Sequence, residues 1–227
     1  MTGVPAPMVD VNPLPTSAVE MTYLIPYVRS LPISEKLARL NWESVSLLHA
    51  DVLSLMYHLA AHTAGPVLEL GPYVGGSTIA IGWGLKQRRG RVVTVELGGR
   101  YEHPTAGTDD IVRDLRRNLR KHDVADRVEL IVGNSRDESV VARVRQAIGA
   151  EKVGLLCMDT DGNIEADYAI YGDLLAPHAY LIIDDFFAPG APHKVKPTRD
   201  GVAALERQGR IECFGVYGWG TWVGRLC

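Results

Sequence analysis

The chain has 227 residues, of which 46% are hydrophobic and 22% are charged, which is typical of a globular domain with one large core. Its formal net charge is -3 and its pI is near 6.2, so charge gives no reason to expect nucleic acid or an anionic membrane as a partner. We therefore expect a small-molecule partner.

The sequence carries no signal for secretion or for a membrane span. Three cysteines, Cys157, Cys213 and Cys227, show no framework spacing, and Cys157 lies in an apolar run where a buried thiol is common. No apolar run approaches the roughly 20 residues of a spanning helix, and the N-terminal residues lack a basic segment followed by an apolar block. We expect a cytoplasmic protein.

The first 32 residues differ from the rest of the chain in their prolines, which interrupt helix and strand alike. We expect residues 1–32 to form an arm or lid and residues 33–227 to form a single domain. From residue 33 onward, apolar residues recur at helical spacing in two stretches, ISEKLARLNW and SVSLLHADVLSLMYHLAAH. These stretches predict two helices before the core.

Short runs rich in Val, Ile and Leu then alternate with helical stretches, namely PVLEL, RVVTVEL, RVELIVG, VGLLCMD and AYLIIDD. Continuous apolar strands separated by helices are typical of a parallel sheet with helices on both faces. The closing segment RIECFGVYGWGTWVGRLC has two strand-like pieces around Gly218, which predict an antiparallel pair at one edge. The predicted fold class is α/β, a doubly wound Rossmann-like sheet.

Each predicted parallel strand ends in a polar or acidic cluster, although the strands themselves are almost purely apolar. In open α/β sheets, ligands bind beyond the carboxyl ends of the strands, where the strand order reverses. We therefore expect the site among residues 69–77, 96–97, 133–137, 159–163 and 184–188.

The glycine-rich segment PVLELGPYVGGSTIAIG follows the first strand and has three nucleotide interpretations. A P-loop needs a lysine between its last glycine and a serine or threonine, and the run Gly76, Ser77, Thr78 has no lysine. A dinucleotide would bring a pyrophosphate close to Glu69, whose carboxylate would repel it. The third interpretation is a ligand with a positively charged amino-acid end that Glu69 helps to hold, and S-adenosylmethionine has that shape and charge. A plain turn between strand and helix is the alternative.

The next strand ends support the third interpretation. Glu96 ends the second strand about where a ribose-binding acid belongs, and Leu97 at the same strand end is included among the cofactor-binding candidates. The third strand end offers Gly133, Asn134 and Ser135, small polar groups that suit the edge of an adenine. Taken singly, each is also compatible with a solvated strand end.

The segments VLELGPYVGGS, VTVEL and VGNSRD, in this order and spacing, resemble the cofactor-binding segments of catechol O-methyltransferase and its relatives, the class I S-adenosylmethionine-dependent methyltransferases. The resemblance covers roughly residues 66–185. It implies a sheet of seven strands, six parallel and the last antiparallel. It also implies that the methionine end of the cofactor is lined by Glu69, Gly71, Tyr73 and Ser77. By the same resemblance, Glu96 binds the ribose, and Ser135 with Arg136 borders the adenine.

Three aspartates at the fourth and fifth strand ends, Asp159, Asp184 and Asp185, predict a metal site. Carboxylates so close together repel one another unless a cation lies among them, and ligation by oxygen alone suits Mg²⁺ or Ca²⁺. The metal-dependent relatives carry acid, acid and acid or amide at the corresponding positions. The alternative is three solvated acids in a metal-free methyltransferase.

The general base is a separate question. The catechol enzymes carry a catalytic lysine three residues after the first metal acid, where this chain has Gly162. The pattern MDTDGN followed by IIDD is closer to the bacterial sugar O-methyltransferases that act on antibiotics and to the cephalosporin hydroxylase-like group. Our catalytic candidates are Asp159 and Asp161. Asp159 is also a candidate cofactor contact, and Asp161 either acts as the base or supports the site from behind the residues that touch the ligands.

The predicted function is metal-dependent transfer of a methyl group from S-adenosylmethionine to a hydroxyl of a small molecule, most readily a natural product. A metal-free methyltransferase and a noncatalytic relative that binds S-adenosylmethionine are the alternatives. A homo-oligomer is also compatible with the sequence. Two roles are compatible with Lys194, namely part of the wall of the acceptor pocket or a solvated charge on a loop. For Trp219 we expect packing in the sheet or a subunit contact.

Overall fold

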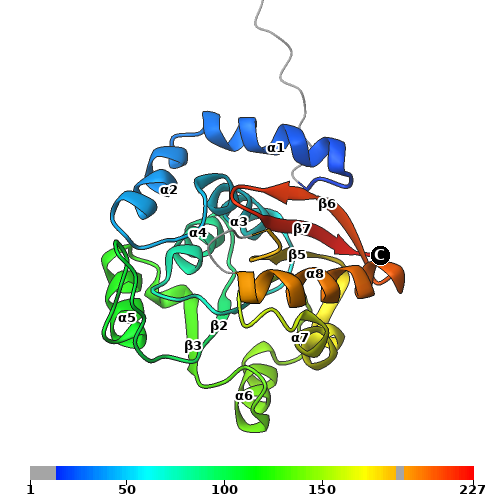
Figure 1. Cartoon of the computed structure of the whole chain (residues 1–227). Helices are drawn as coiled ribbons and strands as arrows, with labels where there is room; N and C mark the ends of the chain where they lie inside the picture. Colours follow the sequence, from blue (N-terminus) through cyan, green and yellow to red (C-terminus); the bar gives the residue numbers. More distant parts are fainter. Residues whose placement is uncertain (1–13, 188–191) are drawn as a thin grey trace, which may run out of the picture.

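Seven strands form one sheet in the order β3-β2-β1-β4-β5-β7-β6 (Figure 1). The computed structural model describes residues 14–187 and 192–227. Strands β1 to β5 pair in parallel, and β7 runs antiparallel to both β5 and β6, so six strands share one direction and β7 opposes them. This confirms the predicted fold class. The strands are β1 (Val67–Leu70), β2 (Val92–Glu96), β3 (Val128–Val132), β4 (Val153–Met158), β5 (Leu175–Ile183), β6 (Ile211–Tyr217) and β7 (Thr221–Leu226).

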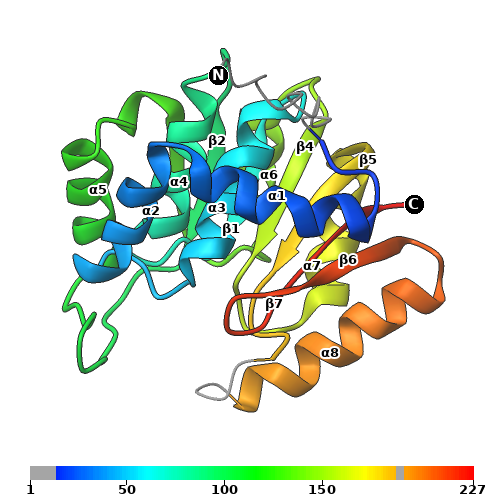
Figure 2. The ribbon, with the colours of Figure 1, turned by 90° about the horizontal axis from the view of Figure 1, so that it is seen from above.

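Helices cover both faces of the sheet, as the apolar strands predicted (Figure 2). Side chains alternate along β1: Val67 packs with helices on one face, whereas Leu68 and Leu70 pack with helices on the other. The first face carries α1 (Ala18–Ser30), α2 (Ile33–Trp42), α3 (Ala50–His62), α4 (Gly76–Leu85) and α5 (Ile111–Lys121), and the second carries α6 (Glu138–Ile148), α7 (Ile164–Tyr171) and α8 (Pro192–Arg207). Two short 3-10 turns cover Ala125–Arg127 and Gly172–Leu174.

The N-terminal segment contains regular structure that the prolines did not predict. Residues 18–30 form α1 despite Pro26 inside the helix, and Ser17 caps its first turn by accepting a hydrogen bond from the Glu20 amide. Met21, Leu24 and Val28 are buried in the core beside α3. The described part of the expected arm, residues 14–32, is therefore packed on the domain. Residues 1–13 lie outside the described residues, and the role of a lid stays a prediction.

The two helices expected before the core are α2 and α3, but the second begins later than the periodicity indicated. Ser44 has a φ of 56°, and α3 begins only at Ala50, with His49 as its N-cap. The loop between them passes the start of α4, since a Cβ added to Gly76 would lie 2.4 Å from the Ser46 Cβ. Across the described ranges, no helix is both long and apolar enough to cross a membrane.

Candidate active site

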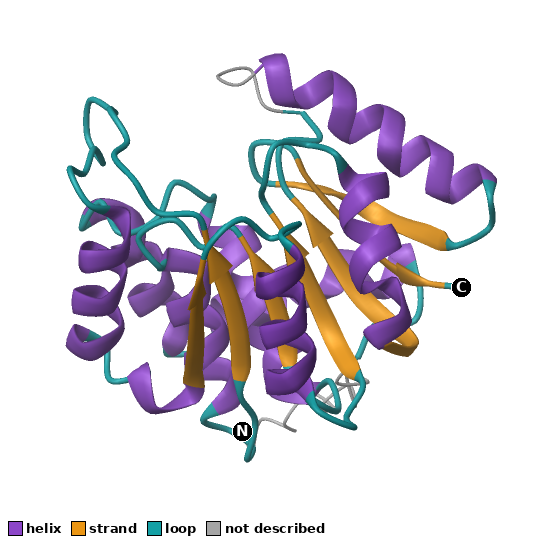
Figure 3. Cartoon of the chain, turned by 90° about the horizontal axis from the view of Figure 1, so that it is seen from below, coloured by secondary structure: helices purple, strands orange, loops and turns teal. Residues whose placement is uncertain are grey.

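The strand ends that carry the predicted site residues lie side by side at one edge of the sheet. The strand order reverses at β1, which has β2 on one side and β4 on the other. Beyond the strands, the hydrogen-bond ladder continues for one more residue: the Gly71 amide donates to Val95, the Asp159 amide to Leu70 and the Asp184 amide to Met158, at 3.0, 2.9 and 2.9 Å. Gly71, Asp159 and Asp184 are therefore neighbours. Figure 3 shows the loops after these strands gathered at this edge.

The loop after β1 requires glycine where it passes β4. Gly71 has a φ of +84°, and a Cβ there would lie 1.9 Å from the Asp159 carbonyl oxygen. Gly75 has a φ of 100° and forms the N-cap of α4, whose first turn leaves backbone amides without helical partners. The loop thus brings bare backbone to the point where the strand order reverses, the usual place for a ligand in this class of fold.

Glu69 lies beneath this loop with one carboxylate oxygen satisfied and the other not. Its side chain is 2% exposed, and its Oε2 accepts hydrogen bonds from the Thr78 and Thr94 hydroxyls at 2.6 and 2.7 Å. Its Oε1 is buried and has no hydrogen-bond partner among the described residues. Burial raises the pKa of Glu69, although the surrounding hydroxyl donors, Ser77 included, act to lower it. An orphaned carboxylate oxygen here would suit the cationic end of a ligand.

Glu96 joins two loops at the end of β2. Its Oε2 accepts a hydrogen bond from the Tyr73 amide at 3.0 Å, and its Oε1 accepts one from the Gly98 amide at 2.8 Å. Burial raises the pKa of Glu96, and these amide donors partly offset the rise. Tyr73 adopts a left-handed φ of 54°, which this hydrogen bond helps to hold. Leu97, the next residue, is 70% exposed, so its side chain is free to flank a ligand.

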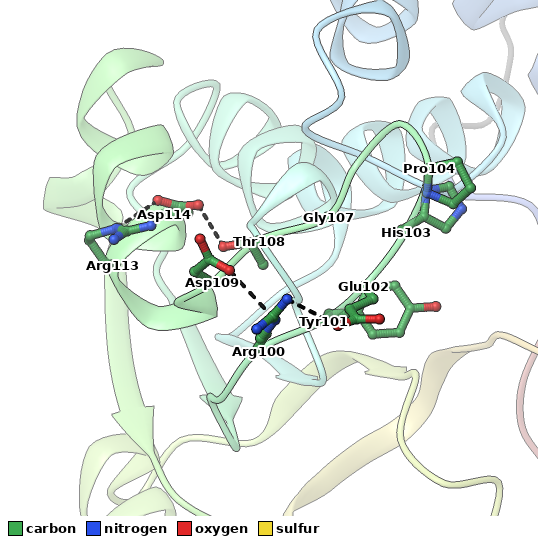
Figure 4. Close-up of a pocket in the computed structure, with 10 residues that line it drawn as sticks. All are labelled: Arg100, Tyr101, Glu102, His103, Pro104, Gly107, Thr108, Asp109, Arg113 and Asp114. Atoms are coloured by element: carbon green, nitrogen blue, oxygen red, sulfur yellow. Dashed lines mark hydrogen bonds and ion pairs between the residues drawn. The ribbon is translucent and has the colours of Figure 1, made fainter.

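A cavity of about 540 Å³ lies in the long loop between β2 and α5 (Figure 4). The loop is tied to the glycine loop, because the Tyr73 hydroxyl donates to the Ala106 carbonyl and the Tyr73 ring meets the Tyr101 ring edge to face at 5.3 Å. The charged side chains around the cavity are paired with one another, for example Arg100 with Glu102 at 3.0 Å. The cavity therefore adjoins the β2 end of the site and lies apart from the three aspartates.

The three aspartates of the predicted metal site do come together. Asp159, Asp184 and Asp185 each offer a carboxylate oxygen, and these oxygens lie within 4.8 Å of one another. The Thr221 hydroxyl donates to Asp184, which fixes that carboxylate from the start of β7. Partial burial and the neighbouring charge of Asp184 raise the pKa of Asp159 to about 8, and burial also raises the pKa of Asp184. Asp185 itself has a left-handed φ of 58°. Ala188, predicted at this strand end, lies outside the described residues.

Asp161 is not among the carboxylates that gather with Asp159, and it is bound instead by Arg136. Both of its carboxylate oxygens accept hydrogen bonds from the Arg136 guanidinium, at 2.8 and 2.6 Å, and these bonds lower the pKa of Asp161 to about 2. The Arg136 Nε also donates to the fully buried Asp167 at 2.9 Å. Arg136 thus ties the end of β3 to the loop after β4. The contacts favour the supporting role for Asp161 and leave the Arg136 guanidinium engaged by acids rather than open toward an adenine.

Two features of the site were not assigned from the sequence. The Lys194 ammonium lies 3.2 Å from Asp159 Oδ1 and 2.9 Å from Asp185 Oδ2, so it belongs to the acid cluster and is not a solvated loop charge. Trp219 in the turn before β7 is 62% exposed, so it does not pack in the sheet, and its ring meets the His49 ring edge to face at 5.2 Å. The signal in the sequence was Gly162, which indicated only that the residue at this place in the catechol enzymes has no counterpart here.

Residues 68–186 match the profile of the family described as "Methyltransferase domain". The chain belongs to this family. A search of curated proteins found no match.

Solved structures confirm the fold of this methyltransferase. The O-methyltransferase TomG from Streptomyces achromogenes, in complex with SAM, has a TM-score of 0.64 at 20% identity, over 92% of this chain and 96% of TomG. An O-methyltransferase from Bacillus cereus in complex with SAH has a TM-score of 0.61 at 18% identity, over 92% and 99%. SAH-bound PaMTH1 from Podospora anserina has a TM-score of 0.60 at 20% identity, over 94% and 89%. At these identities the likeness establishes the class I fold that the sequence segments predicted.

Proposed function

We propose that this methyltransferase moves the methyl group of S-adenosylmethionine to a hydroxyl oxygen of a small molecule, with a divalent cation at the three aspartates. The observation that carries the proposal is the continued ladder from Gly71 through Asp159 to Asp184, which places a glycine loop and an acid cluster next to each other. In the reaction, an acceptor oxygen attacks the methyl carbon, the carbon–sulfur bond breaks, and its electron pair stays on sulfur. The products are a methyl ether, S-adenosylhomocysteine and a proton.

The residues around the glycine loop fit the cofactor. The methionine end would lie along Gly71, Tyr73 and Ser77, with its ammonium near the orphaned Oε1 of Glu69. The ribose hydroxyls would donate to Glu96, whose oxygens keep lone pairs after accepting the two amide hydrogen bonds. Leu97 and Ser135 would border the adenine from the ends of β2 and β3. The bound SAM and SAH in the structural neighbours named above support this assignment.

The acid cluster fits a hard divalent ion, Mg²⁺ or Ca²⁺. Its donors are all carboxylate oxygens, and both burial and mutual repulsion disfavour three bare charges at such distances. When bound, such an ion holds an acceptor hydroxyl and lowers its pKa. The chain's own contribution is to fix Asp184 through Thr221 and to align the acceptor with the methyl group.

A metal-free mechanism is the second candidate, and a specific observation favours it. Because the pKa of Asp159 is raised to about 8, its carboxylate could itself accept the acceptor proton near neutral pH. A noncatalytic relative is the third candidate, and it gives no reason for three aspartates to gather within 4.8 Å.

For the acceptor we propose only a class of compound. A hydroxylated natural product agrees with the neighbour TomG, which is described as involved in Tomaymycin synthesis. The three cysteines are free thiols, in keeping with a cytoplasmic location. A homo-oligomer stays a prediction.

The test measures S-adenosylhomocysteine formation with a panel of phenolic, catecholic and glycosidic hydroxyl acceptors. The protein is first treated with EDTA and dialysed, and Mg²⁺ is then titrated back. We expect turnover to vanish after chelation and to return with the metal. Turnover that survives thorough chelation would replace the metal mechanism with Asp159 as a simple base. S-adenosylhomocysteine binding without turnover on any acceptor would favour the noncatalytic relative.

A further inference from the structure

Lys194 places a positive charge inside the acid cluster. Its ammonium is 3.2 Å from Asp159 Oδ1 and 2.9 Å from Asp185 Oδ2, and it thereby bridges the ends of β4 and β5. Its side chain is only 27% exposed. A lysine side chain is a cation at neutral pH, and both of its partners here are carboxylates. Two of the three carboxylates that could hold a metal ion are therefore already held by a cation.

The position of this lysine is built into the fold. Lys194 lies in the first turns of α8, which pack on the loop after β4 at Gly162. A Cβ at Gly162 would lie 2.8 Å from the Lys194 carbonyl oxygen and 2.8 Å from the Thr198 hydroxyl, and Gly162 also has a φ of +87°. A side chain at this position would push α8 away from the site. The glycine that stands where the catechol enzymes carry their lysine is thus the residue that lets Lys194 approach.

We propose that Lys194 is an internal counter-cation that competes with the divalent ion for Asp159 and Asp185 and so lowers the metal affinity of the site. This inference rests on the metal site of the proposed function. Without metal, the ammonium relieves the repulsion among the three carboxylates. With metal, two cations share one small cluster, and their repulsion at such short range is large even at an effective protein dielectric constant of about 20. Metal binding must then displace the lysine or bear that repulsion.

The direct test is calorimetric titration of the full chain with MgCl₂, and separately with CaCl₂, at one fixed pH. Lys194→Met keeps the length and apolar stem of the side chain but removes its charge. We expect the dissociation constant for the metal ion to fall about tenfold or more in this variant, because one full positive charge is removed from beside the carboxylate ligands. The matched control is Lys196→Met on the same helix, whose side chain is 83% exposed and pairs with Asp200, and it should leave the affinity unchanged.

Thermal unfolding gives a second readout that is independent of activity. In EDTA, Lys194→Met should unfold at a lower temperature than the wild type, since its three carboxylates have lost their counter-cation. Added Mg²⁺ should then raise its unfolding temperature more than that of the wild type. If the methionine variant does not fold, Lys194→Arg retains the charge, and its metal affinity should stay at or below the wild-type value.

The outcomes separate this inference from the proposed function. Equal metal affinity in the wild type and Lys194→Met would overturn the competition while leaving the metal site in place. Weaker binding in Lys194→Met would also overturn it, because the lysine would then support the ligands. Tighter binding by Lys194→Arg than by the wild type would do the same. If neither the wild type nor Lys194→Met binds either metal and methyl transfer persists in EDTA, the metal site and this inference fail together.

Discussion

The acids at the ends of β1 and β2 and those at the ends of β4 and β5 lie at the same edge of the sheet, but they are held in different ways. Glu69 and Glu96 receive hydrogen bonds from neutral donors, namely threonine hydroxyls and backbone amides. Asp159 and Asp185 share one charged lysine, and a third carboxylate lies within 4.8 Å. The first region receives only neutral donors and leaves the Oε1 of Glu69 without a partner, whereas the second is balanced by a cation.

The difference shows what each half of the site is prepared to hold. Neutral donors fix the geometry of a carboxylate and leave its negative charge in place, which suits an organic ligand with an ammonium and hydroxyl groups. Three carboxylates in one cluster are not neutralised in that way, and their repulsion is relieved by a cation among them or by a proton on one of them. The predictions below test this division, from the largest expected effect to the smallest.

Removing one charge from the acid cluster should abolish most turnover. For Asp184→Asn we expect methyl transfer to fall about 100-fold or more, the scale seen when one group that stabilises a transition state is removed. Affinity for S-adenosylhomocysteine should stay unchanged, because the cofactor contacts come from other strand ends. The amide oxygen can still accept from Thr221, so the fold should hold. Asp185→Asn should keep partial activity, since an amide oxygen can still ligate a hard metal ion.

Kinetics and calorimetry on the same preparations check this prediction. Loss of cofactor affinity in Asp184→Asn, in parallel with activity, would contradict the division into two halves. Full activity in Asp184→Asn would remove the acid cluster from the mechanism.

Removing Glu96 should damage the other half. Glu96→Ala should weaken S-adenosylhomocysteine binding by about 1 to 3 kcal/mol, the range for losing a charged hydrogen-bond partner. Glu96→Gln keeps one acceptor oxygen and should lose less. The control is Glu129→Ala, which removes an exposed acid from the neighbouring strand β3. Calorimetry decides the matter, and an unchanged affinity in a folded Glu96→Ala protein would mean that the ribose lies elsewhere.

The sequence allowed the strands and their polar ends to be predicted because both signals are local. An apolar run that stops at an acid marks a buried strand and its polar end together, as VVTVE does at Glu96. Helix α1 was missed because Pro26 inside it, with the prolines that precede it in the chain, masks a helix that is held by burial of Met21 and Leu24. Tertiary packing, which no local pattern reports, outweighed the propensity of that segment.

The contacts among the charged residues were less predictable, for a physical reason. Arg136 reaches from the end of β3 to Asp161 after β4, and Lys194 reaches back from α8 to Asp159. Long side chains choose among several acids at a crowded edge, and only the packing of α8 on Gly162 fixes which acid Lys194 meets. The residues of the cluster could be predicted, but the cation that partners them in the chain could not.

Glu69 allows a test by pH of the cofactor half without cofactor. Because burial raises its pKa in the folded protein, Glu69 favours the fold only below its unfolded pKa of about 4.3, and this stability is lost as the pH rises through the folded value. Glu69→Gln cannot ionise and does not lose this stability. Its free energy of unfolding should therefore increase relative to that of the wild type as the pH rises from 4 to neutral. Its amide oxygen can still accept from Thr78 and Thr94, while its cofactor affinity should fall.

Urea unfolding at several pH values measures this gap, with the exposed Glu129→Gln as control. A gap that does not widen with pH would show that Glu69 is not held as a buried acid. An unchanged affinity for S-adenosylhomocysteine would remove Glu69 from the methionine end.

The smallest effect is expected at Trp219, in the turn that leads to Thr221 beside the acid cluster. Trp219 lies two residues before Thr221, which donates to Asp184, and the Phe187 amide donates to the Gly220 carbonyl beside it at 3.0 Å. An indole ring that is 62% exposed at this place can pack on an acceptor. For Trp219→Ala we expect the KM of the acceptor that supports turnover to rise about two- to tenfold, the worth of one aromatic contact.

The kcat and the affinity for S-adenosylhomocysteine should stay unchanged in Trp219→Ala, because the described contact of the ring is with His49, which is neither a proposed cofactor contact nor a proposed metal ligand. Trp42→Ala is the matched control, since Trp42 is 81% exposed at the end of α2. A change in kcat without a change in KM would assign Trp219 to alignment of the reacting atoms. No change in kcat or KM would indicate that the Trp219 ring serves a subunit contact instead. Sedimentation of Trp219→Ala and Trp42→Ala would test this, because only the loss of a contact residue shifts the oligomeric state.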